Sequence, residues 1–501
     1  MSGDDDWWTS SNEAVLVSLV TPTDAGVKTL DTFHPEYTNN VFGEKEQIFG
    51  YKGLRINLQY NASDMLPNLK VSWKKKYQPT ADEEALDINE VLSEFLPEVA
   101  FQKQSDFETR LKSLPKNWTP PGTLVNSFNN KHGDFEVYSG KITDPAVKQL
   151  LNRVQILVPF FVDGGTPIDL EDPDAERWTL YFLYNKREFA YHFAGYCTLY
   201  KYYPLQVPTE TESKTPTDTP SFSLDGDFDL DNLPCRTRIS QFIIIPPFQQ
   251  KGLGSRLYSI IYQQYLKHEP TIELTVEDPN EAFDDMRDLA DLAFLSKQPE
   301  FQALKIDTSI EIPDEGKAPN NIVDQEAWET CRKKFKIVPR QFARVLEMYL
   351  MSQLPASVRP GLDIPQDEEE EDTGRSKGKG KEKALPKPTA EDEHMYRLWM
   401  MLVKRRLYVH NRDALGQLEL KERREELAKV FAGVEFDYAR LLIKAEQQGK
   451  LAAADAASET EKEPPATPSA ANGKRKLDEV EQAEEAAGAS SKKARVESGS
   501  D

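Results

Sequence analysis

The chain has 501 residues, of which 39% are hydrophobic, so it is long enough for two or three domains with buried cores. Its formal net charge of -22 disfavours direct binding to nucleic acid and favours a basic protein or peptide as partner, because an acidic surface attracts such a partner; a charge that only keeps the protein soluble is the alternative. No apolar run approaches the roughly 20 residues of a membrane helix, and three cysteines form no disulfide framework, which indicates the cytoplasm or nucleus.

The first part of the chain is expected to be a disordered lead, residues 1–12, followed by an N-terminal domain of strands and helices, residues 13–130. Residues 50–61 predict a strand that is entered through a turn, and residues 68–77 predict its hairpin partner. Apolar residues recur at helical spacing over residues 87–96, which predicts a helix.

Residues 131–295 are expected to form the central domain. A helix begins after Asp144, which can cap it, and Pro145 suits its first turn. Residues 178–186 and 189–203 are rich in aromatic residues and predict two strands joined in a hairpin.

The composition changes at residues 205–234, which are rich in Pro, Thr and Asp and predict a mobile surface insertion. Residues 236–248 predict a strand that two prolines end. A glycine-rich turn, a helix to about His268 and a further strand at residues 271–279 follow.

The C-terminal part changes character three times. Residues 296–355 predict a helical domain, residues 356–392 a charged disordered linker, and residues 393–450 a helical appendage. Residues 451–501 lack the apolar content for a core and predict a disordered tail, whose two basic clusters are typical of nuclear import signals. Together the segments predict an α+β protein.

The turn after the strand of residues 236–248 carries the clearest chemical signal. It has the sequence Gln249-Gln250-Lys251-Gly252-Leu253-Gly254 and opens a helix, whose first NH groups have no partner within the helix and suit an anion such as a pyrophosphate. A turn that only serves packing is the alternative. The turn is not a Walker loop, because no Gly-Lys-Ser/Thr follows, and its spacing is not a dinucleotide fingerprint.

The strings RTRISQFIIIPPFQQKGLGSRL and IELTVEDPNEAFDDMRD resemble the coenzyme A signature of the GCN5-related acetyltransferase superfamily, and more closely the type B histone acetyltransferase catalytic subunits. HPEYTNNVFGEKEQIFGYKGLRI is similar to the amino-terminal domain of that family. The resemblance covers roughly residues 30–355. It implies a central mixed, mostly antiparallel sheet flanked by helices, and transfer of acetyl from acetyl-coenzyme A to lysines of newly made, free histone 4.

By this resemblance Glu277 matches the general base and Asp278 an adjacent supporting acid. Free lysine has a pKa of about 10.4, so a base must remove its proton before it can attack. Two neighbouring carboxylates can raise each other's pKa, which suits a base. A turn of acidic residues at the end of a strand is the alternative reading.

The resemblance also implies cofactor contacts from the strand before the turn, from the turn and from one later residue. They are Phe242, Ile243, Ile244, Gln249, Gln250, Lys251, Gly252, Leu253, Gly254, Ser255 and Asn280. Backbone NH groups of the strand are expected to stabilise the developing oxyanion.

Two further segments match places where the family holds the histone tail. They are Glu44-Lys45-Glu46 and Tyr200-Lys201-Tyr202. Acidic groups pair with basic residues, and aromatic faces pack on lysine stems. A solvated loop and an ordinary aromatic strand are the alternatives, and the lysine in the middle of the first segment weakens a purely electrostatic role.

The resemblance implies a WD-repeat histone-binding subunit as partner, and places the protein in the cytoplasm and nucleus. We expect no metal, because the six histidines and three cysteines have no zinc-type spacing. Two alternatives remain open: an acetyltransferase for another protein or a small amine, and a non-catalytic histone chaperone that uses its acidic surface.

Overall fold

The computed structural model describes residues 7–80, 83–188, 190–203, 232–312, 319–361 and 387–449. The chain divides into two compact units, Met1–Ala454 and Asp455–Asp501. All the described residues belong to the first unit. Most of the predicted insertion at residues 205–234, most of the predicted linker at 356–392 and the whole predicted tail at 451–501 lie outside the described residues.

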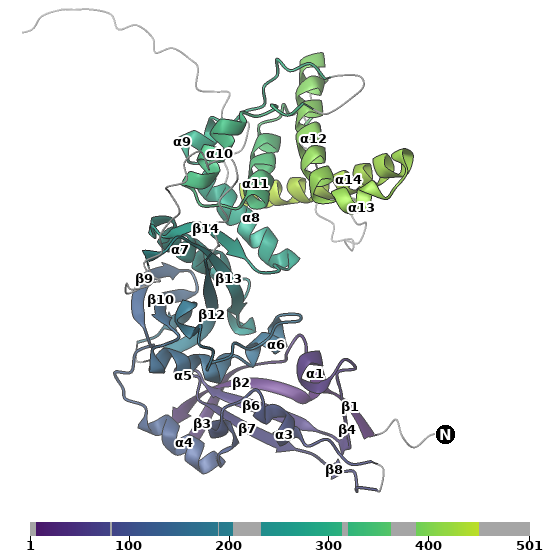
Figure 1. Ribbon diagram of the computed structural model, residues 1–501. Helices are drawn as coiled ribbons and strands as arrows, with labels where there is room; N and C mark the ends of the chain where they lie inside the picture. The colour runs from purple at the N-terminus through teal and green to yellow at the C-terminus, as the bar shows by residue number, and fades with distance from the viewer. Residues whose placement is uncertain are drawn as a thin grey trace, which may run out of the picture. The chain divides into compact units, whose positions relative to one another are not determined.

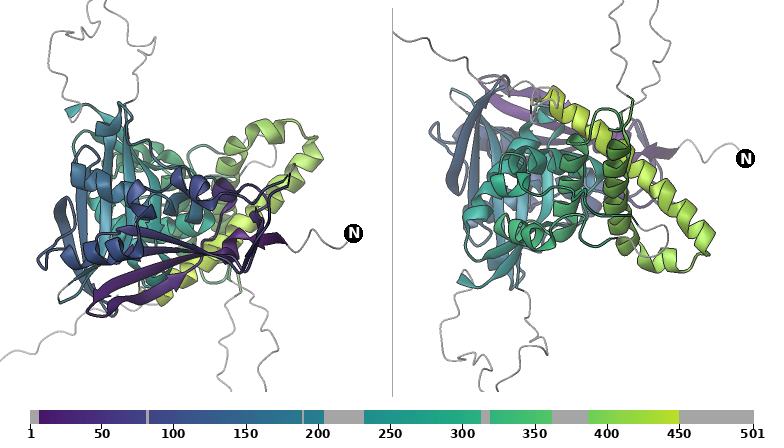
Figure 2. Two further views of the ribbon diagram at one scale, coloured as in Figure 1. Left: turned by 90° about the horizontal axis from the view of Figure 1, so that it is seen from below. Right: turned by 90° about the horizontal axis from the view of Figure 1, so that it is seen from above.

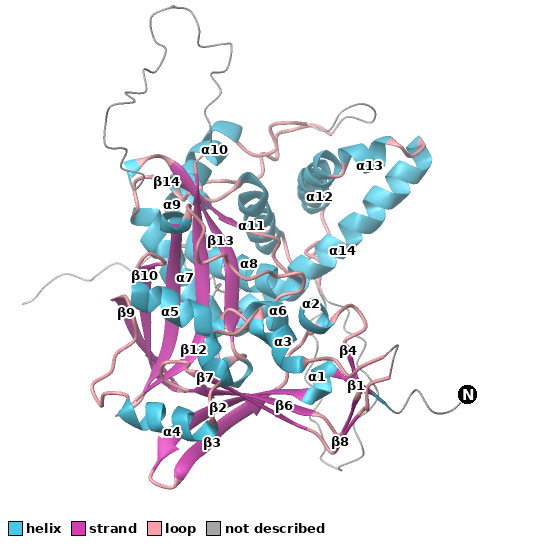
Figure 3. Cartoon of the chain, turned by 60° about the horizontal axis from the view of Figure 1, so that its bottom comes forward, coloured by secondary structure: helices cyan, strands magenta, loops and turns pink. Residues whose placement is uncertain are grey.

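A six-stranded sheet, in the order β14-β13-β12-β11-β10-β9, forms the centre of this unit (Figures 1 and 3). The strands are β9 (Thr123–Asn130), β10 (Gly133–Lys141), β11 (Trp178–Lys186), β12 (Tyr191–Tyr202), β13 (Cys235–Ile244) and β14 (Thr271–Val276). All neighbours are antiparallel except β13 and β14. The protein is thus a mixed α+β fold with a mostly antiparallel central sheet. Strand β9 pairs with β10 and so belongs to the central sheet. The domain boundary predicted at residue 130 would instead assign β9 to the N-terminal domain.

The hairpin of β11 and β12 confirms the two aromatic-rich strands predicted from the sequence. Residues 180–185 of β11 are all buried, so this strand is covered on both faces and shows no polar alternation. The predicted helix is also present as α5 (Pro145–Val154), where the Asp144 carboxylate accepts hydrogen bonds from the NH groups of Ala146 and Val147.

The N-terminal part has its own sheet, in the order β3-β2-β6-β7. Its strands are β2 (Val15–Thr23), β3 (Gly26–Phe33), β6 (Arg55–Asn61) and β7 (Pro67–Ser72). Strands β6 and β7 are the predicted strand and its hairpin partner, and they pair antiparallel. The Phe193 NH donates to the Ala62 carbonyl at 2.7 Å, and the Arg153 guanidinium lies 3.0 Å from the Asp64 carboxylate. These contacts join the N-terminal sheet to the central one.

Short elements complete the N-terminal part. They are β1 (Trp8–Ser10), α1 (Ser11–Ala14), α2 (Asn39–Phe42), β4 (Gln47–Phe49), β5 (Tyr51–Lys52), β8 (Lys75–Lys76), α3 (Ile88–Ser93) and α4 (Gln104–Ser113). The short helix α6 (Leu157–Phe161) follows α5, between β10 and β11 of the central sheet. The prediction of a disordered lead over residues 1–12 is wrong from Trp7 onwards. Strand β1 pairs with β4, and the rings of Trp8 and Phe49 lie 5.0 Å apart, so partners distant in sequence order this segment.

Of the remaining described α-helices, α7 connects the parallel strands β13 and β14, and the others follow β14 in the chain. These helices are α7 (Leu253–Lys267), α8 (Glu281–Leu295), α9 (Pro299–Gln302), α10 (Gln325–Lys334), α11 (Pro339–Ser352), α12 (Ala390–His410), α13 (Arg412–Gly416) and α14 (Leu420–Gln447) (Figures 1 and 2). No helix in the described ranges combines the length and the apolar character needed to cross a bilayer.

The helices predicted as an appendage are built into the core. Trp399 of α12 is fully buried and donates to the Glu347 carbonyl of α11 at 2.9 Å. The buried Glu347 carboxylate accepts from Arg406 at 2.8 Å and from the Tyr438 hydroxyl of α14 at 2.8 Å. A buried carboxylate needs such partners because its desolvation is costly, so α11, α12 and α14 are fixed to one another.

Candidate active site

Strands β13 and β14 diverge at the centre of the candidate site. Their parallel pairing ends with Ile239 opposite Val276. The last hydrogen bond between the two strands runs from the Glu277 NH to the Ile239 carbonyl and is 2.9 Å long. Beyond this point β13 continues to Ile244 beside β12 only. In the described part of the chain this stretch of β13 therefore has one edge without a strand partner, where an extended ligand can form main-chain hydrogen bonds.

A β-bulge lies at the same point. Along β12, Thr198 is opposite Gln241 while Leu199 is opposite Ile239, so Ser240 is the extra residue of β13. Bulges redirect side chains and are frequent beside active sites. Here the Ser240 hydroxyl donates to the Glu277 carboxylate at 2.6 Å.

The Glu277 carboxylate is held but remains accessible. Arg238 donates to its second oxygen at 3.2 Å, and the Glu277 side chain is 41% exposed. Ser240 and Arg238 thus fix its orientation, while solvent or a substrate can still reach it. An accessible carboxylate can come within hydrogen-bond reach of a substrate proton, which is the first requirement of a general base.

The glycine-rich turn places the start of α7 beside the end of β13. Gln250 and Gly252 have φ values of 57° and 73°, in the left-handed region that glycine adopts without strain. Gly252 is the N-cap of α7, and no side chain caps the helix. The first NH groups of α7 are therefore available to an anion.

A cavity of about 670 Å³ lies along this turn. Parts of β13, the turn, α7, α8 and the end of α14 line it. The lining residues are Phe242, Ile244, Phe248, Gln249, Gln250, Gly252, Leu253, Gly254, Ser255, Asn280, Ala282, Phe283, Asp285, Met286, Leu289, Lys444 and Gln448. We call this cavity the α7 groove.

The α7 groove brings together nine of the eleven residues predicted to contact the cofactor. Of the other two, Ile243 has its side chain in the core, with 3% exposed, and the Lys251 ammonium donates to the Pro247 carbonyl at 2.5 Å. Asn280 lines the groove and also caps α8 by accepting from the Phe283 NH at 2.9 Å. An apolar floor with free helix NH groups at one end fits a cofactor that has a pantetheine arm and a diphosphate.

A second cavity, of about 410 Å³, opens at Glu277 and Asp278. Its wall includes three carboxylates of the loop before β11, namely Asp163, Asp169 and Asp172. We call it the acidic cavity. It suits a cationic side chain, because carboxylates attract a lysine ammonium. This loop was not predicted from the sequence, although the run of aspartates before Trp178 was a visible signal.

The bulged strand and the acidic loop are directly connected. The Gln241 amide of β13 donates to the Thr166 carbonyl at 2.9 Å, which ties the loop to the residue after Ser240. The acidic cavity is thereby fixed against the Glu277 carboxylate.

The first predicted histone-binding segment lies near this loop. Glu46 accepts from the Thr38 NH at 2.7 Å and from Asn12 at 2.9 Å, so it holds the local fold, whereas Glu44 and Lys45 are exposed. Asn40, in the adjoining helix α2, donates to the Gly165 carbonyl at 3.3 Å. The segment is therefore placed beside the acidic loop.

The second predicted segment is divided between the two faces of β12. The Tyr200 hydroxyl accepts from Arg177 at 3.0 Å, and the Arg238 guanidinium lies 5.8 Å from the ring centre of the half-exposed Tyr202. Lys201 is buried and lines a different cavity, with His268. Successive strand residues point to opposite faces, so the two tyrosines are directed toward the Arg238 side and Lys201 is not.

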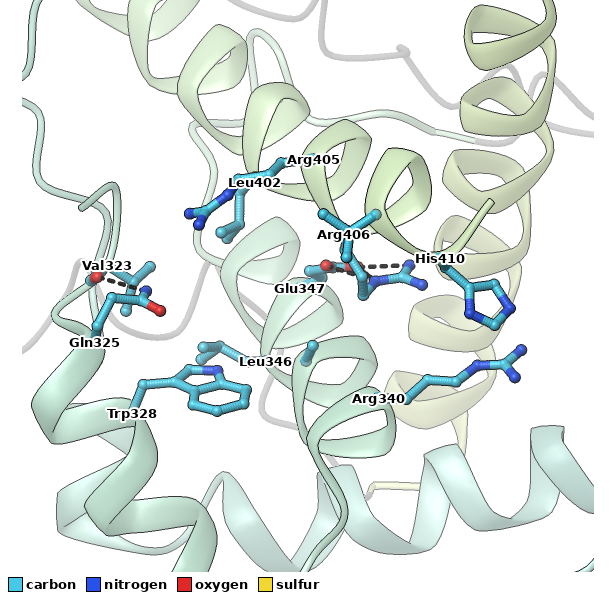
Figure 4. Close-up of a pocket in the computed structure, with 12 residues that line it drawn as sticks. Val323, Gln325, Trp328, Arg340, Leu346, Glu347, Leu402, Arg405, Arg406 and His410 are labelled. Carbon is cyan, nitrogen blue, oxygen red and sulfur yellow. Dashed lines mark hydrogen bonds and ion pairs between the residues drawn. The ribbon is translucent and has the colours of Figure 1, made fainter. Parts of the chain in front are cut away.

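A further pocket lies between α10, α11 and α12 and contains none of the predicted site residues (Figure 4). Trp328, Leu346 and Leu402 form its apolar part, and its carboxylate, Glu347, is paired with Arg406 at 2.8 Å. The carboxylate of this pocket is thus engaged in an ion pair within the helical part. No group of three or more His, Cys, Asp or Glu residues placed to hold a metal occurs among the described residues.

Known proteins with similar sequences identify the family. The chain is 86% identical, over the full length of both proteins, to a histone acetyltransferase type B catalytic subunit of Neurospora crassa. The chain belongs to the type B histone acetyltransferase catalytic subunits. Subunits of the same description in Gibberella zeae and Aspergillus oryzae are 44% identical over 98% of both chains, and 35% identical over 88% of this chain and 87% of the relative.

Two parts of the chain also match families described as "Histone acetyl transferase HAT1 N-terminus", at residues 7–163, and "Fungal HAT1, C-terminal", at residues 288–355. The protein is therefore a histone acetyltransferase, and membership of this family implies acetyl-coenzyme A as the acetyl donor. The resemblance and the enzyme class predicted from the sequence are confirmed.

Replacing Ser240 with alanine is expected to lower kcat about threefold to tenfold. The exposed Glu277 carboxylate keeps Arg238 and solvent as partners, so the loss is that of an ordinary hydrogen bond, about 0.7–1.4 kcal/mol, and 1.36 kcal/mol corresponds to a tenfold change in rate. The KM for acetyl-coenzyme A is expected to stay unchanged, because Ser240 does not line the α7 groove. Steady-state kinetics measure both values.

Ser259→Ala is the matched control, since the Ser259 hydroxyl donates only to the Ser255 carbonyl within α7. An unchanged kcat in Ser240→Ala would show that the hydroxyl does not position the base.

Proposed function

We propose that this enzyme acetylates lysines in the tail of newly synthesised, free histone 4, by direct attack in a ternary complex on a GCN5-related acetyltransferase fold. The observation that carries the proposal is the place of Glu277. Its carboxylate stands where β13 and β14 diverge and lines the acidic cavity, while the adjoining strand residues Phe242 and Ile244 line the α7 groove. Both substrates can thus meet at one strand.

The α7 groove is the proposed place of acetyl-coenzyme A. The free NH groups at the start of α7 bind the diphosphate, and the unpaired edge of β13 binds the amides of the pantetheine arm. Phe242 and Ile244 pack against the arm. The bound cofactor supplies the acetyl group as a thioester.

The acidic cavity is the proposed place of the substrate lysine. Glu277 takes the proton from the ammonium, directly or through one water, and Asp278 supports it. The neutral amine forms a bond to the thioester carbonyl carbon, and main-chain NH groups of β13 stabilise the oxyanion. The carbon–sulfur bond then breaks, the nitrogen loses its extra proton, and coenzyme A leaves as a thiolate that takes up a proton from solvent.

Direct attack is favoured over a covalent acetyl-enzyme because the cysteines are poorly suited as nucleophiles. All three of them, Cys197, Cys235 and Cys331, are buried. Burial raises the pKa of the Cys331 thiol to about 11 and that of Cys197 well above its ordinary value, so these thiols are protonated at neutral pH. A reactive cysteine is instead an accessible thiolate.

The proposed partners follow from charge and family. A net charge of -22 attracts the basic histone, and Glu44, Tyr200 and Tyr202 are the proposed contacts to its tail. The relatives are named catalytic subunits, which implies a complex, and we propose a WD-repeat histone-binding subunit as the second component. For activity on free, newly made histones, we propose that the enzyme is present in the cytoplasm and nucleus.

The acceptor is tested by incubating the full chain with acetyl-coenzyme A and either free histone 4 or a polyamine, followed by mass spectrometry. Acetyl groups are expected on lysines of the histone 4 tail, with little product from the polyamine. Acetylation of the polyamine at an equal rate, with no preference for the histone, would contradict the proposed acceptor and favour a small-amine acetyltransferase.

A further inference from the structure

The last described helix reaches the α7 groove. Lys444, in the last turn of α14, and Gln448, at its C-cap, both line the groove. In Figures 1 and 2, α14 is the long light-green to yellow helix near the C-terminal end of the described chain. The groove is therefore made partly by a segment that follows the two matched family regions, which end at residue 355.

An ion pair fixes α14 in this position. The Arg440 guanidinium donates to both oxygens of Asp285 in α8, at 2.6 and 2.9 Å, and such two-point pairs define geometry well. Leu441 and Ala445, on the same helix, are buried. The end of α14 is thus held against α8 by both charge and packing.

The pair between Arg440 and Asp285 also changes the charge of the groove. Asp285 lines the groove, and a free carboxylate there would repel a phosphate. Arg440 neutralises it. Because Lys444 follows Arg440 by four residues, the two cations lie on one face of α14.

The Lys444 ammonium is available to a ligand. It is exposed, and across the described ranges its side chain has no hydrogen bond or ion pair, unlike that of Arg440. A lysine in the last turn of a helix also stabilises the helix end through the macrodipole. Stabilising the end of α14 does not explain why the Lys444 side chain lines the same cavity as the uncapped start of α7.

We propose that Lys444 binds a phosphate of coenzyme A, so that α14 completes the cofactor site. This inference rests on the proposed function, because it takes the α7 groove as the cofactor site. Lysine binds phosphate as a point charge. Coenzyme A carries phosphate in its diphosphate and on the 3′ position of its ribose, and the chemistry of Lys444 suits either group.

The test is calorimetric titration of the full chain with coenzyme A and with dephospho-coenzyme A, which lacks the 3′-phosphate. Lys444→Ala is expected to raise the Kd for coenzyme A about fivefold, the upper range for an exposed charge pair, and Lys444→Arg is expected to retain most of the affinity. An effect limited to coenzyme A assigns Lys444 to the 3′-phosphate, and an equal effect on both ligands assigns it to the diphosphate.

Kinetics separate a cofactor contact from a general structural role. In Lys444→Ala the KM for acetyl-coenzyme A should rise, while kcat and the KM for a histone 4 peptide stay unchanged. Lys421→Ala is the matched control, because Lys421 lies in the first turn of the same helix and its side chain is 88% exposed.

Two results would overturn the inference. One is a Kd for coenzyme A in Lys444→Ala equal to that of the unmodified chain. The other is an equal loss of affinity in Lys444→Arg, since the retained charge would then not matter. Failure of the unmodified chain to bind coenzyme A at all would instead contradict the proposed function, so the two failures are distinguishable.

Discussion

Glu277→Gln is expected to lower kcat by about 10²- to 10⁴-fold, the range that general bases contribute. Glutamine has the size of glutamate and can still accept the hydrogen bond that Ser240 donates to this position at 2.6 Å, but it cannot take a proton from lysine. The KM values for acetyl-coenzyme A and for histone 4 peptide are expected to change little. Steady-state kinetics with both substrates varied measure the effect.

The same variant separates catalysis from histone binding. Binding of histone 4, measured by calorimetry, should be retained in Glu277→Gln, which would show that the fold and the acidic surface are intact. A kcat within threefold of that of the unmodified chain would rule out Glu277 as the base.

Gly254→Val is expected to raise the KM for acetyl-coenzyme A about 100-fold or more. A Cβ atom at Gly254 would lie 3.1 Å from the Met286 sulfur, 3.7 Å from a ring carbon of Phe242 and 3.8 Å from a side-chain carbon of Ile244. The two further methyl groups of valine would occupy the space between β13 and α8 that the cofactor needs. Displacement of a reacting group by about 1 Å can by itself lower the reaction rate about 100-fold.

The control for this variant is Gly433→Val. Gly433 lies inside α14, and a Cβ atom there would meet nothing within 4 Å, so the substitution tests only the effect of valine in a helix. Unaltered affinity for acetyl-coenzyme A in Gly254→Val would show that the cofactor binds elsewhere.

Local patterns in the sequence predicted the elements that carry the chemistry. The cap at Asp144, the aromatic hairpin of β11 and β12, and the strand–turn–helix around Gly252 each depend on residues close together in the chain. Their interactions are therefore visible as spacing and composition. The α7 groove could be predicted for the same reason, because one continuous segment supplies most of its lining.

Features formed by residues far apart in the chain could not be predicted from the sequence. The ordering of Trp8 depends on Phe49, and the acidic loop is held by a hydrogen bond between Gln241 and Thr166, 75 residues apart. The position of α14 depends on the pair of Arg440 with Asp285, 155 residues apart. Pairing across such separations is decided by the tertiary fold, on which local propensity gives no information.

The position of Lys201 is a different case, because the sequence did contain the answer. In a strand, neighbouring residues point to opposite faces, so Tyr200 and Tyr202 share one face and Lys201 lies on the other. A group of three consecutive strand residues therefore cannot form one contact surface. The bulge at Ser240, in contrast, has no sequence signature and is apparent only from the shift in pairing with β12.

The central claim is that one strand, β13, places the thioester and the lysine beside Glu277. A crystal structure of the full chain with coenzyme A covalently joined to the lysine of a histone 4 peptide tests it most directly. The diphosphate is expected at the first turn of α7, with the lysine nitrogen about 3 Å from the Glu277 carboxylate or one water away. A diphosphate bound outside the α7 groove, or a lysine nitrogen remote from Glu277, would contradict the account.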